Sequence, residues 1–194
     1  MRRYHHGDLR AALLARAEQT LREKGADALS LRQLAKDLGV SHAAPSRHFK
    51  DKRALLDALA LTGLDRLAGA MERANTGPGD IRSRLLALAR AYVDFAIAEP
   101  ELLEVMYTGK HDPLVSDQVV AAGERLGVAI LRPIVEAQEA GEVVAGDPAG
   151  IAMVAASALH GFASLTANGS FEKNDAPELL EGIIDHLLSG LSPR

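Results

Sequence analysis

The sequence predicts an all-α protein, and three observations lead to that fold class. Aromatic residues make up only 4% of the 194 residues, whereas alanine and leucine, which favour helices, recur throughout the chain. Apolar residues repeat at spacings of three and four, and we find no segment in which polar and apolar residues alternate as in a half-buried strand. Since 47% of the residues are hydrophobic, the chain is able to bury a core. We expect about nine helices in two domains, residues 1–55 and 56–194.

The first helix is predicted to run from about Asp8 to Lys24, with leucines along one face and Gly25 at its end. Ser30 is expected to begin a second, shorter helix, and Gln33 follows three residues later. This spacing predicts a capping box, in which each side chain binds the other residue's free backbone N–H group.

A third helix is expected after Gly39, a residue type that tolerates the positive φ of a tight turn, with Ser41 as its cap. Pro45 falls in or just beyond the first turn of this helix, where the loss of one N–H group is tolerated. Asp51 is expected to cap a fourth helix, which continues to the turn-rich residues 75–80.

The rest of the chain is predicted to form five further helices, over about 81–99, 100–107, 114–141, 148–168 and 177–189. Residues 148–171 contain no Asp, Glu, Lys or Arg and are long enough to span a bilayer, but several polar residues interrupt them. We therefore expect a helix buried in the protein core. The first residues hold no continuous apolar stretch of the kind found in signal peptides, so we expect a cytoplasmic protein.

Charge is distributed unevenly along the chain. Residues 1–56 hold twelve Lys and Arg against six Asp and Glu, a net charge of +6, whereas residues 57–194 carry −10. A basic segment on an acidic protein favours a polyanion such as nucleic acid as the partner of that segment, with solvated helix faces as the alternative explanation. The chain contains no cysteine, which excludes a disulfide scaffold, thiol nucleophiles and cysteine-based zinc sites.

Residues 30–49 have the features of a helix-turn-helix unit. Ala35 lies where the two helices are expected to approach most closely, and a larger side chain there would push them apart. Gly39 supplies the turn between them. The outward residues of the second member are small or able to form hydrogen bonds, as a surface that enters a DNA groove requires. They are His42, Ala43, Ser46 and Arg47.

An ordered set of motifs in about the first 60 residues resembles the tetracycline-repressor (TetR) family of bacterial regulators. The motifs are Tyr4-His5-His6-Gly7-Asp8-Leu9-Arg10, Leu31-Arg32-Gln33-Leu34-Ala35, Leu38-Gly39-Val40-Ser41, and Arg47-His48-Phe49 followed by Lys52 and Leu55. The resemblance implies an N-terminal three-helix DNA-binding domain and a C-terminal helical domain for ligand binding and dimerisation.

The resemblance also implies which residues contact DNA. Those placed near base edges are His42, Ala43 and Ala44. Those placed near phosphates are Ser30, Arg32, Ser41, Ser46, His48 and Lys52, and Arg47 completes the predicted DNA-binding set. The family usually has a tyrosine where this chain has Ser46, so the phosphate contact is either lost or made with the helix closer to the DNA backbone. Packing or capping beside Phe49 is the alternative role for His48.

A second resemblance lies at Leu159-His160-Gly161, which is similar to the C-terminal domain of a TetR subgroup with a Trp-His-Gly motif, although Leu159 stands in place of the tryptophan. A regulator of this kind needs a cavity for a small-molecule effector. The predicted lining residues are Leu64, Leu67, Tyr92, Phe95, Met106, Tyr107, Leu131, Met153, His160 and Ser164. Ordinary core packing is the alternative for each of them, including a structural role for His160.

Catalysis is not expected from this sequence. His160 has Ser157 and Ser164 within one helical turn, but no orienting group or oxyanion site accompanies them. We find neither a glycine-rich phosphate loop nor a histidine spacing typical of metal sites, and we expect no cofactor and no metal.

The leading hypothesis is a homodimeric repressor that binds a near-palindromic DNA operator and is released by a small molecule of unknown identity. We expect the dimer to form through the last two helices, the second of which carries an apolar stripe between Leu179 and Leu188. An effector-independent protein-interaction module with weakened DNA binding is the alternative, because Ser46 replaces the usual tyrosine. The helix beginning near Asp51 is expected to couple effector and DNA, since it carries Lys52 at one end and Leu64 further along.

Overall fold

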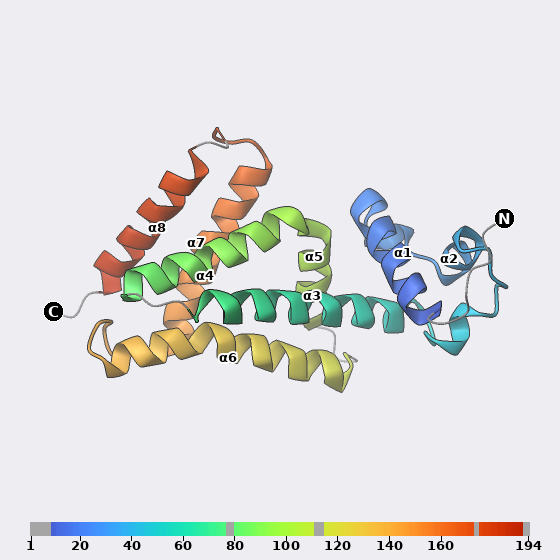
Figure 1. Ribbon diagram of the computed structural model, residues 1–194, viewed down its shortest axis with the longest axis horizontal. Helices are drawn as coiled ribbons and strands as arrows, with labels where there is room; N and C mark the ends of the chain where they lie inside the picture. The colour runs from blue at the N-terminus through green and yellow to red at the C-terminus, as the bar shows by residue number, and fades with distance from the viewer. Residues whose placement is uncertain (1–8, 77–79, 111–114, 173–174, 192–194) are drawn as a thin grey trace. The chain divides into compact units, whose positions relative to one another are not determined.

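The computed structural model describes residues 9–76, 80–110, 115–172 and 175–191. Within these ranges the chain forms eight α-helices, two short 3₁₀ helices and no strand, which confirms the predicted all-α fold (Figure 1). The α-helices are α1 (Leu9–Lys24), α2 (Leu31–Asp37), α3 (Lys52–Ala74), α4 (Ile81–Ala98), α5 (Pro100–Lys110), α6 (Asp117–Glu139), α7 (Pro148–Ala167) and α8 (Ala176–Leu191). The 3₁₀ helices are η1 (Ala26–Ala28) and η2 (Pro45–Arg47).

The chain folds into two compact units. The first comprises residues 1–64 and 99–122, and the second comprises residues 65–98 and 123–194. Helices α3 and α6 each contribute residues to both units. These units reflect packing and not function. The expected boundary between a DNA-binding domain and a ligand-binding domain, at residues 55 and 56, therefore stays a prediction.

In the first unit, α1 packs against α2, η2 and α5. The buried side chains that join these elements include Leu13 and Ala17 of α1, Leu34 and Ala35 of α2, and Phe49 after η2. Ala35 is completely buried, as expected for the point where the two members of the helix-turn-helix unit approach. The main-chain N–H of Val40 donates to the Ala35 carbonyl at 3.0 Å across the turn.

Two glycines in this unit have a left-handed backbone, which the sequence predicts for Gly39. Gly25 ends α1 with φ +75°, and Gly39 makes the turn after α2 with φ +66°. A side chain at either position would be strained in this conformation, because its Cβ would crowd the backbone. The cap of α3 is also confirmed, since the Asp51 carboxylate accepts a hydrogen bond from the Ala54 N–H at 2.8 Å.

The predicted capping box of α2 is wrong. Ser30 is the N-cap residue in an extended conformation, but its side chain makes no cap hydrogen bond. Gln33 reaches forward instead and donates to the Asp37 carboxylate at 2.7 Å. The physical reason is that a charged acceptor one turn ahead gives the amide a stronger hydrogen bond than the backbone N–H behind it.

The expected third helix, beginning at Ser41, is also corrected. Residues 41–44 form turns, and only Pro45–Arg47 are helical, as the 3₁₀ helix η2. Proline lacks an N–H group, so Pro45 cannot donate to the Ser41 carbonyl as an α-helix requires. The Ala44 N–H donates to that carbonyl at 2.9 Å in a tighter turn.

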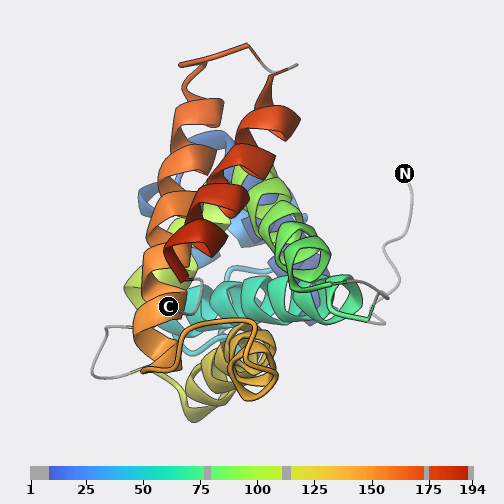
Figure 2. The same cartoon turned by 90° about the vertical axis from the view of Figure 1, so that its left-hand side faces the viewer.

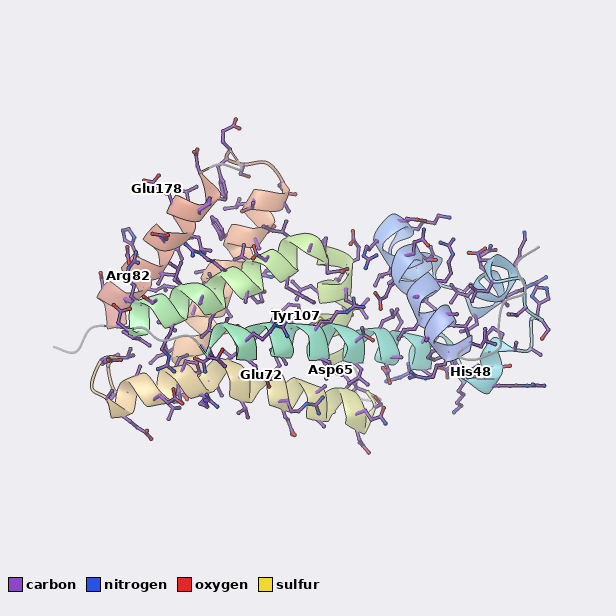
Figure 3. All side chains as sticks on the ribbon, in the orientation of Figure 1. His48, Asp65, Glu72, Arg82, Tyr107 and Glu178 are labelled. Atoms are coloured by element: carbon purple, nitrogen blue, oxygen red, sulfur yellow. The ribbon has the colours of Figure 1, made fainter. Side chains whose placement is uncertain are left out.

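The second unit is organised around α4, which packs against both α7 and α8. These two helices lie side by side, as Figures 1 and 2 both show. Arginines of α4 bind carboxylates of α8: Arg82 binds Asp185 at 2.5 and 2.9 Å, and Arg90 binds Glu181 at 2.7 Å. Arg82 is labelled in Figure 3. The Arg82 ion pair lowers the pKa of Asp185, with its hydrogen bond as the largest cause.

Helix α7 is not the fully buried helix that the sequence predicts. Only 22% of its most apolar 18-residue window is buried, and Met153, Val154 and Leu165 are 67%, 61% and 50% exposed. The reason is geometric, because α4 and α8 cover only part of its circumference within this unit. By length and composition alone, α7 is the one described helix that could cross a membrane.

Candidate DNA-binding surface and effector site

The candidate DNA-binding surface is built around residues 41–48, here called the reading turn. Pro45 inside the turn and Phe49 directly after it are both buried, and they anchor the segment in the first unit. The Phe49 N–H donates to the Pro45 carbonyl at 2.9 Å, which closes the turn over this anchor. With Pro45 and Phe49 directed inward, the other side chains of the reading turn face solvent, apart from the half-buried Ala44.

All ten residues predicted to contact DNA lie in the first unit. Eight of them are exposed: Ser30, Arg32, Ser41, His42, Ala43, Ser46, Arg47 and His48. His48 is labelled in Figure 3. Ala44 and Lys52 are half-buried. The arrangement therefore gathers small, polar and basic side chains at the reading turn and at the starts of α2 and α3, although their contacts with DNA remain predictions.

Two of the predicted phosphate ligands are engaged within the protein. The Ser46 hydroxyl donates to the Ala43 carbonyl at 2.9 Å, and the Lys52 ammonium donates to the Asp27 carbonyl at 3.1 Å. An ammonium has three donors, so Lys52 retains the capacity to bind phosphate while it holds the η1 segment. The single donor of Ser46 is used, and a phosphate bond from it requires the hydroxyl to rotate away from Ala43.

A cluster around Asp37 supports the same surface and was not recognised in the sequence. The Asp37 carboxylate accepts hydrogen bonds from Gln33 at 2.7 Å and from Arg16 of α1 at 2.8 Å. These bonds hold the pKa of Asp37 below its ordinary value, with Gln33 as the larger cause. The spacing of four between Gln33 and Asp37 is a signal that sequence reasoning could have used. No sequence pattern connects Arg16 with Asp37.

The ten residues predicted to line an effector site are divided between the two units. Leu64, Met106 and Tyr107 belong to the first unit. Leu67, Tyr92, Phe95, Leu131, Met153, His160 and Ser164 belong to the second. Met153, His160 and Ser164 share the exposed face of α7. Tyr107 of α5, labelled in Figure 3, is exposed as well. Their role in effector binding remains a prediction.

Two members of this set, Tyr92 and His160, share a hydrogen bond. The Tyr92 hydroxyl lies 3.0 Å from Nδ1 of His160 and joins α4 to α7. Tyr92 is buried, whereas the histidine ring reaches the exposed face of α7. The hydrogen bond from a buried phenol therefore restricts the orientation of the His160 ring.

An open groove of about 1170 Å³ lies along α7 and α8 in the second unit, and the sequence did not predict it. Its lining residues are Ala158, Phe171, Asp175, Glu178, Leu179, Glu181, Gly182, Ile183, Asp185, His186 and Leu187. None of them belongs to the predicted effector set. The groove combines apolar side chains with carboxylates, some of which the arginines of α4 already neutralise.

Comparison with known proteins agrees with this arrangement of elements. Residues 13–59 match a family model described as bacterial regulatory proteins, tetR family, and residues 85–189 match one described as tetracyclin repressor-like, C-terminal domain. The second match includes the Leu159-His160-Gly161 motif, but its description names no subgroup, so the Trp-His-Gly assignment stays a prediction.

Relatives cover most or all of the chain. It is 34% identical to the uncharacterised HTH-type transcriptional regulator YobS of Bacillus subtilis (strain 168), over 87% of this chain and 85% of that protein. It is 48% identical to a protein of unknown function from Rhodococcus sp. RHA1, with a TM-score of 0.89 over the whole of both chains.

The TetR-family regulator PfmR from Thermus thermophilus has a TM-score of 0.71 at 24% identity, over 93% of this chain and 99% of that one, and so shares the fold. The structure and the matches together show a DNA-binding regulator rather than an enzyme, and the chain belongs to the TetR family of bacterial transcriptional regulators.

Proposed function

We propose that this regulator is a homodimeric repressor, that its reading turn binds a near-palindromic operator, and that a small-molecule effector releases it from DNA. The observation that carries the proposal is the reading turn, which exposes small and basic side chains above a buried Pro45–Phe49 anchor. Such a surface is able to enter a major groove without steric conflict. Operator binding in turn requires the compartment that holds the chromosome, which supports the expected cytoplasmic location.

The exposed face of α7 supports the homodimer. Val154, Gly161 and Leu165 fall on one stripe, since they are seven and four residues apart on a helix of 3.6 residues per turn. A Cβ atom built on Gly161 meets nothing within 4 Å, so this stripe is open to the close approach of another helix. An apolar helical face of this size is unusual on a monomer, and a second copy of the chain would cover it.

The Tyr92–His160 pair supports an effector site in the second unit. A polar group whose orientation is fixed by a buried partner gives a binding site specificity at low entropic cost. Effector binding and DNA binding must be reciprocal, so an effector that weakens DNA binding tenfold binds the DNA complex tenfold less tightly, a coupling of about 1.4 kcal/mol. A small-molecule screen against the operator complex would first identify an effector. Tyr92→Phe and His160→Leu should then lower the protein's affinity for that effector, while its affinity for the operator stays unchanged.

The DNA-binding proposal is tested by selecting duplexes from a random pool with the purified full-length protein. Enrichment of a near-palindromic sequence is expected, with half-sites one helical turn apart, about 34–36 Å. Arg47→Ala in the reading turn should weaken binding to the enriched duplex. The matched control is Arg90→Ala, which removes an exposed arginine from the second unit and should leave binding unchanged.

One observation favours the second candidate, a protein-interaction module with weakened DNA binding. Ser46 stands where the family usually carries a tyrosine, and its hydroxyl is bonded to the Ala43 carbonyl. The selection experiment separates the two functions, because an interaction module would enrich no sequence over the starting pool. Ser46→Tyr should then raise affinity for DNA if the missing phenol is the cause.

A further inference from the structure

Helix α1 is attached at its first turn to the reading turn. The Arg10 guanidinium carbon lies 5.3 Å from the centroid of the Phe49 ring, a cation–π contact. Phe49 is only 2% exposed and directly follows the reading turn. A shift of the start of α1 would therefore change the position of Phe49.

The last turn of α1 is attached to the junction between α4 and α5. Arg22 donates two hydrogen bonds to the Glu99 carboxylate, from Nε at 2.9 Å and from Nη2 at 3.1 Å. Glu99 is the single residue between Ala98, which ends α4, and Pro100, which begins α5. Two parallel bonds between a guanidinium and a carboxylate fix orientation as well as distance. The same bonds raise the pKa of Arg22 above its ordinary value, with Glu99 as the main cause.

The position of Glu99 is itself fixed by packing within the first unit. Helix α5 packs against α1, and it approaches α3 so closely at Gly63 that a Cβ atom there would lie 2.5 Å from the Met106 sulfur and 3.1 Å from Leu102. Leu102 and Met106 are both buried. The carboxylate that receives Arg22 is thus carried by a helix with little freedom to slide.

Helix α1 is rigid between its two attachments. It has 16 residues, which span about 24 Å at 1.5 Å per residue, and Leu13, Ala17 and Leu21 are buried along its length. Midway, Arg16 binds Asp37 of α2 at 2.8 Å. A rigid rod held at one end transmits a small change of tilt to the other end, where the reading turn lies.

We propose that Arg22 and Glu99 are positioning residues for DNA binding, because their ion pair sets the tilt of α1 and, through α1, the position of the reading turn. Neither residue touches DNA in this proposal. The junction between α4 and α5 thereby acts on the DNA-binding surface by a route separate from α3. The proposal rests on the proposed role of the reading turn.

The test uses the full-length protein and the operator selected with the unmodified chain, at a series of salt concentrations. Arg22→Gln and Glu99→Gln should each weaken operator binding about two- to fivefold, the range expected for a well-formed pair near the surface. The double variant should bind no more weakly than Arg22→Gln, because that variant already loses the Glu99 pair together with the longer Glu18 pair at 3.6 Å. The slope of log affinity against log salt should not change, since no phosphate contact is lost.

The exchange Arg22→Glu with Glu99→Arg restores the pair with opposite polarity and should recover part of the affinity, because it also places a second carboxylate one turn from Glu18. The control is the Asp65–Arg125 pair of the second unit, 2.7 Å apart, whose arginine is about as exposed as Arg22, at 56% against 47%; Asp65 is labelled in Figure 3. Arg125→Gln should leave operator affinity unchanged. Circular dichroism at the assay temperature establishes that each variant is folded. If a single variant does not fold, the exchange variant tests the role of the ion pair.

Three results would overturn the proposal. They are unchanged affinity in both single variants, additive losses in the double variant, and a salt slope flattened by about 0.9 in Arg22→Gln alone, which would make Arg22 a phosphate contact. Failure of the unmodified protein to select any operator would contradict the proposed function instead, so the two failures are distinguishable.

Discussion

Glutamate at Val154 and Leu165 should convert the proposed dimer into monomers. Both residues lie on the exposed stripe of α7, eleven residues and about three helical turns apart. Neither belongs to the protomer's own core, being 61% and 50% exposed. The substitutions are therefore compatible with a folded protomer.

The size of the effect follows from the exposed apolar surface. Met153, Val154, Leu165 and Leu179 together retain the equivalent of about two fully exposed side chains, and burial of each equivalent contributes about 1.5–3 kcal/mol. Two protomers would gain about 6–12 kcal/mol from these residues, against an association cost of about 4–15 kcal/mol. Four unpaired glutamates at the interface would each cost several kcal/mol, so the dimer should weaken at least about a hundredfold, or about 2.8 kcal/mol.

Sedimentation equilibrium at micromolar concentration measures this change directly. The matched control is Val128→Glu on α6, because Val128 is equally exposed, at 64%, but lies outside the proposed interface. That variant should remain a dimer. Ile184→Glu on α8 would be a poor test, since Ile184 is buried within the protomer and the charge would disrupt its core. A monomeric unmodified protein, or a Val154→Glu and Leu165→Glu variant that stays dimeric, would refute the reasoning.

Three further predictions follow from the same structure. Lys52→Ala should weaken DNA binding about equally on all sequences and flatten the slope of log affinity against log salt by about 0.9. His42→Ala should instead change the sequence preference in a repeated selection. An equal loss of affinity on all sequences for His42→Ala would contradict its place at base edges. Gly63→Ala should lower the free energy of unfolding by about 1–3 kcal/mol, because the added Cβ would overpack α5, while Gly123→Ala, where a Cβ meets nothing within 4 Å, should not destabilise the protein in thermal melts. The pKa of Asp37 is lowered in the folded protein, so its contribution to stability should be complete above the ordinary pKa of 3.8 and be lost as the pH falls through the lower folded value. Asp37→Asn should therefore reduce the pH dependence of the free energy of unfolding in acid. An unchanged pH dependence would assign this effect to other carboxylates.

The helix boundaries illustrate how far sequence reasoning reaches in this chain. Apolar spacing and turn residues predicted α1, α3, α4 and α8 to within a few residues, because these signals depend on the chain's immediate neighbourhood. Local reasoning failed at the start of α2, where the Gln33 amide binds the Asp37 carboxylate and not the backbone N–H group of Ser30. It failed again at Pro45, whose missing N–H shortened the expected third helix to one 3₁₀ turn.

The candidate site divides in the same way. The residues of the reading turn follow one another in the chain, so a motif was sufficient to identify them, and the structure then placed most of them at the surface. The effector residues come from separate helices, and no local pattern predicted that Tyr92 would meet His160 across 68 positions. The groove along α7 and α8 was missed for the same reason.

By itself, the sequence determined the helices, the glycine turns, the family and the segment proposed to read DNA, because each depends on residues close together in the chain. Only the tertiary structure decided that α7 leaves an apolar face uncovered, that Arg22 binds Glu99 across 77 positions, and that a Cβ at Gly63 would crowd Met106. These features arise from the packing of whole helices. Helical periodicity tells which side of a helix is apolar, but which neighbour covers that side depends on the free energy of packing all the helices together.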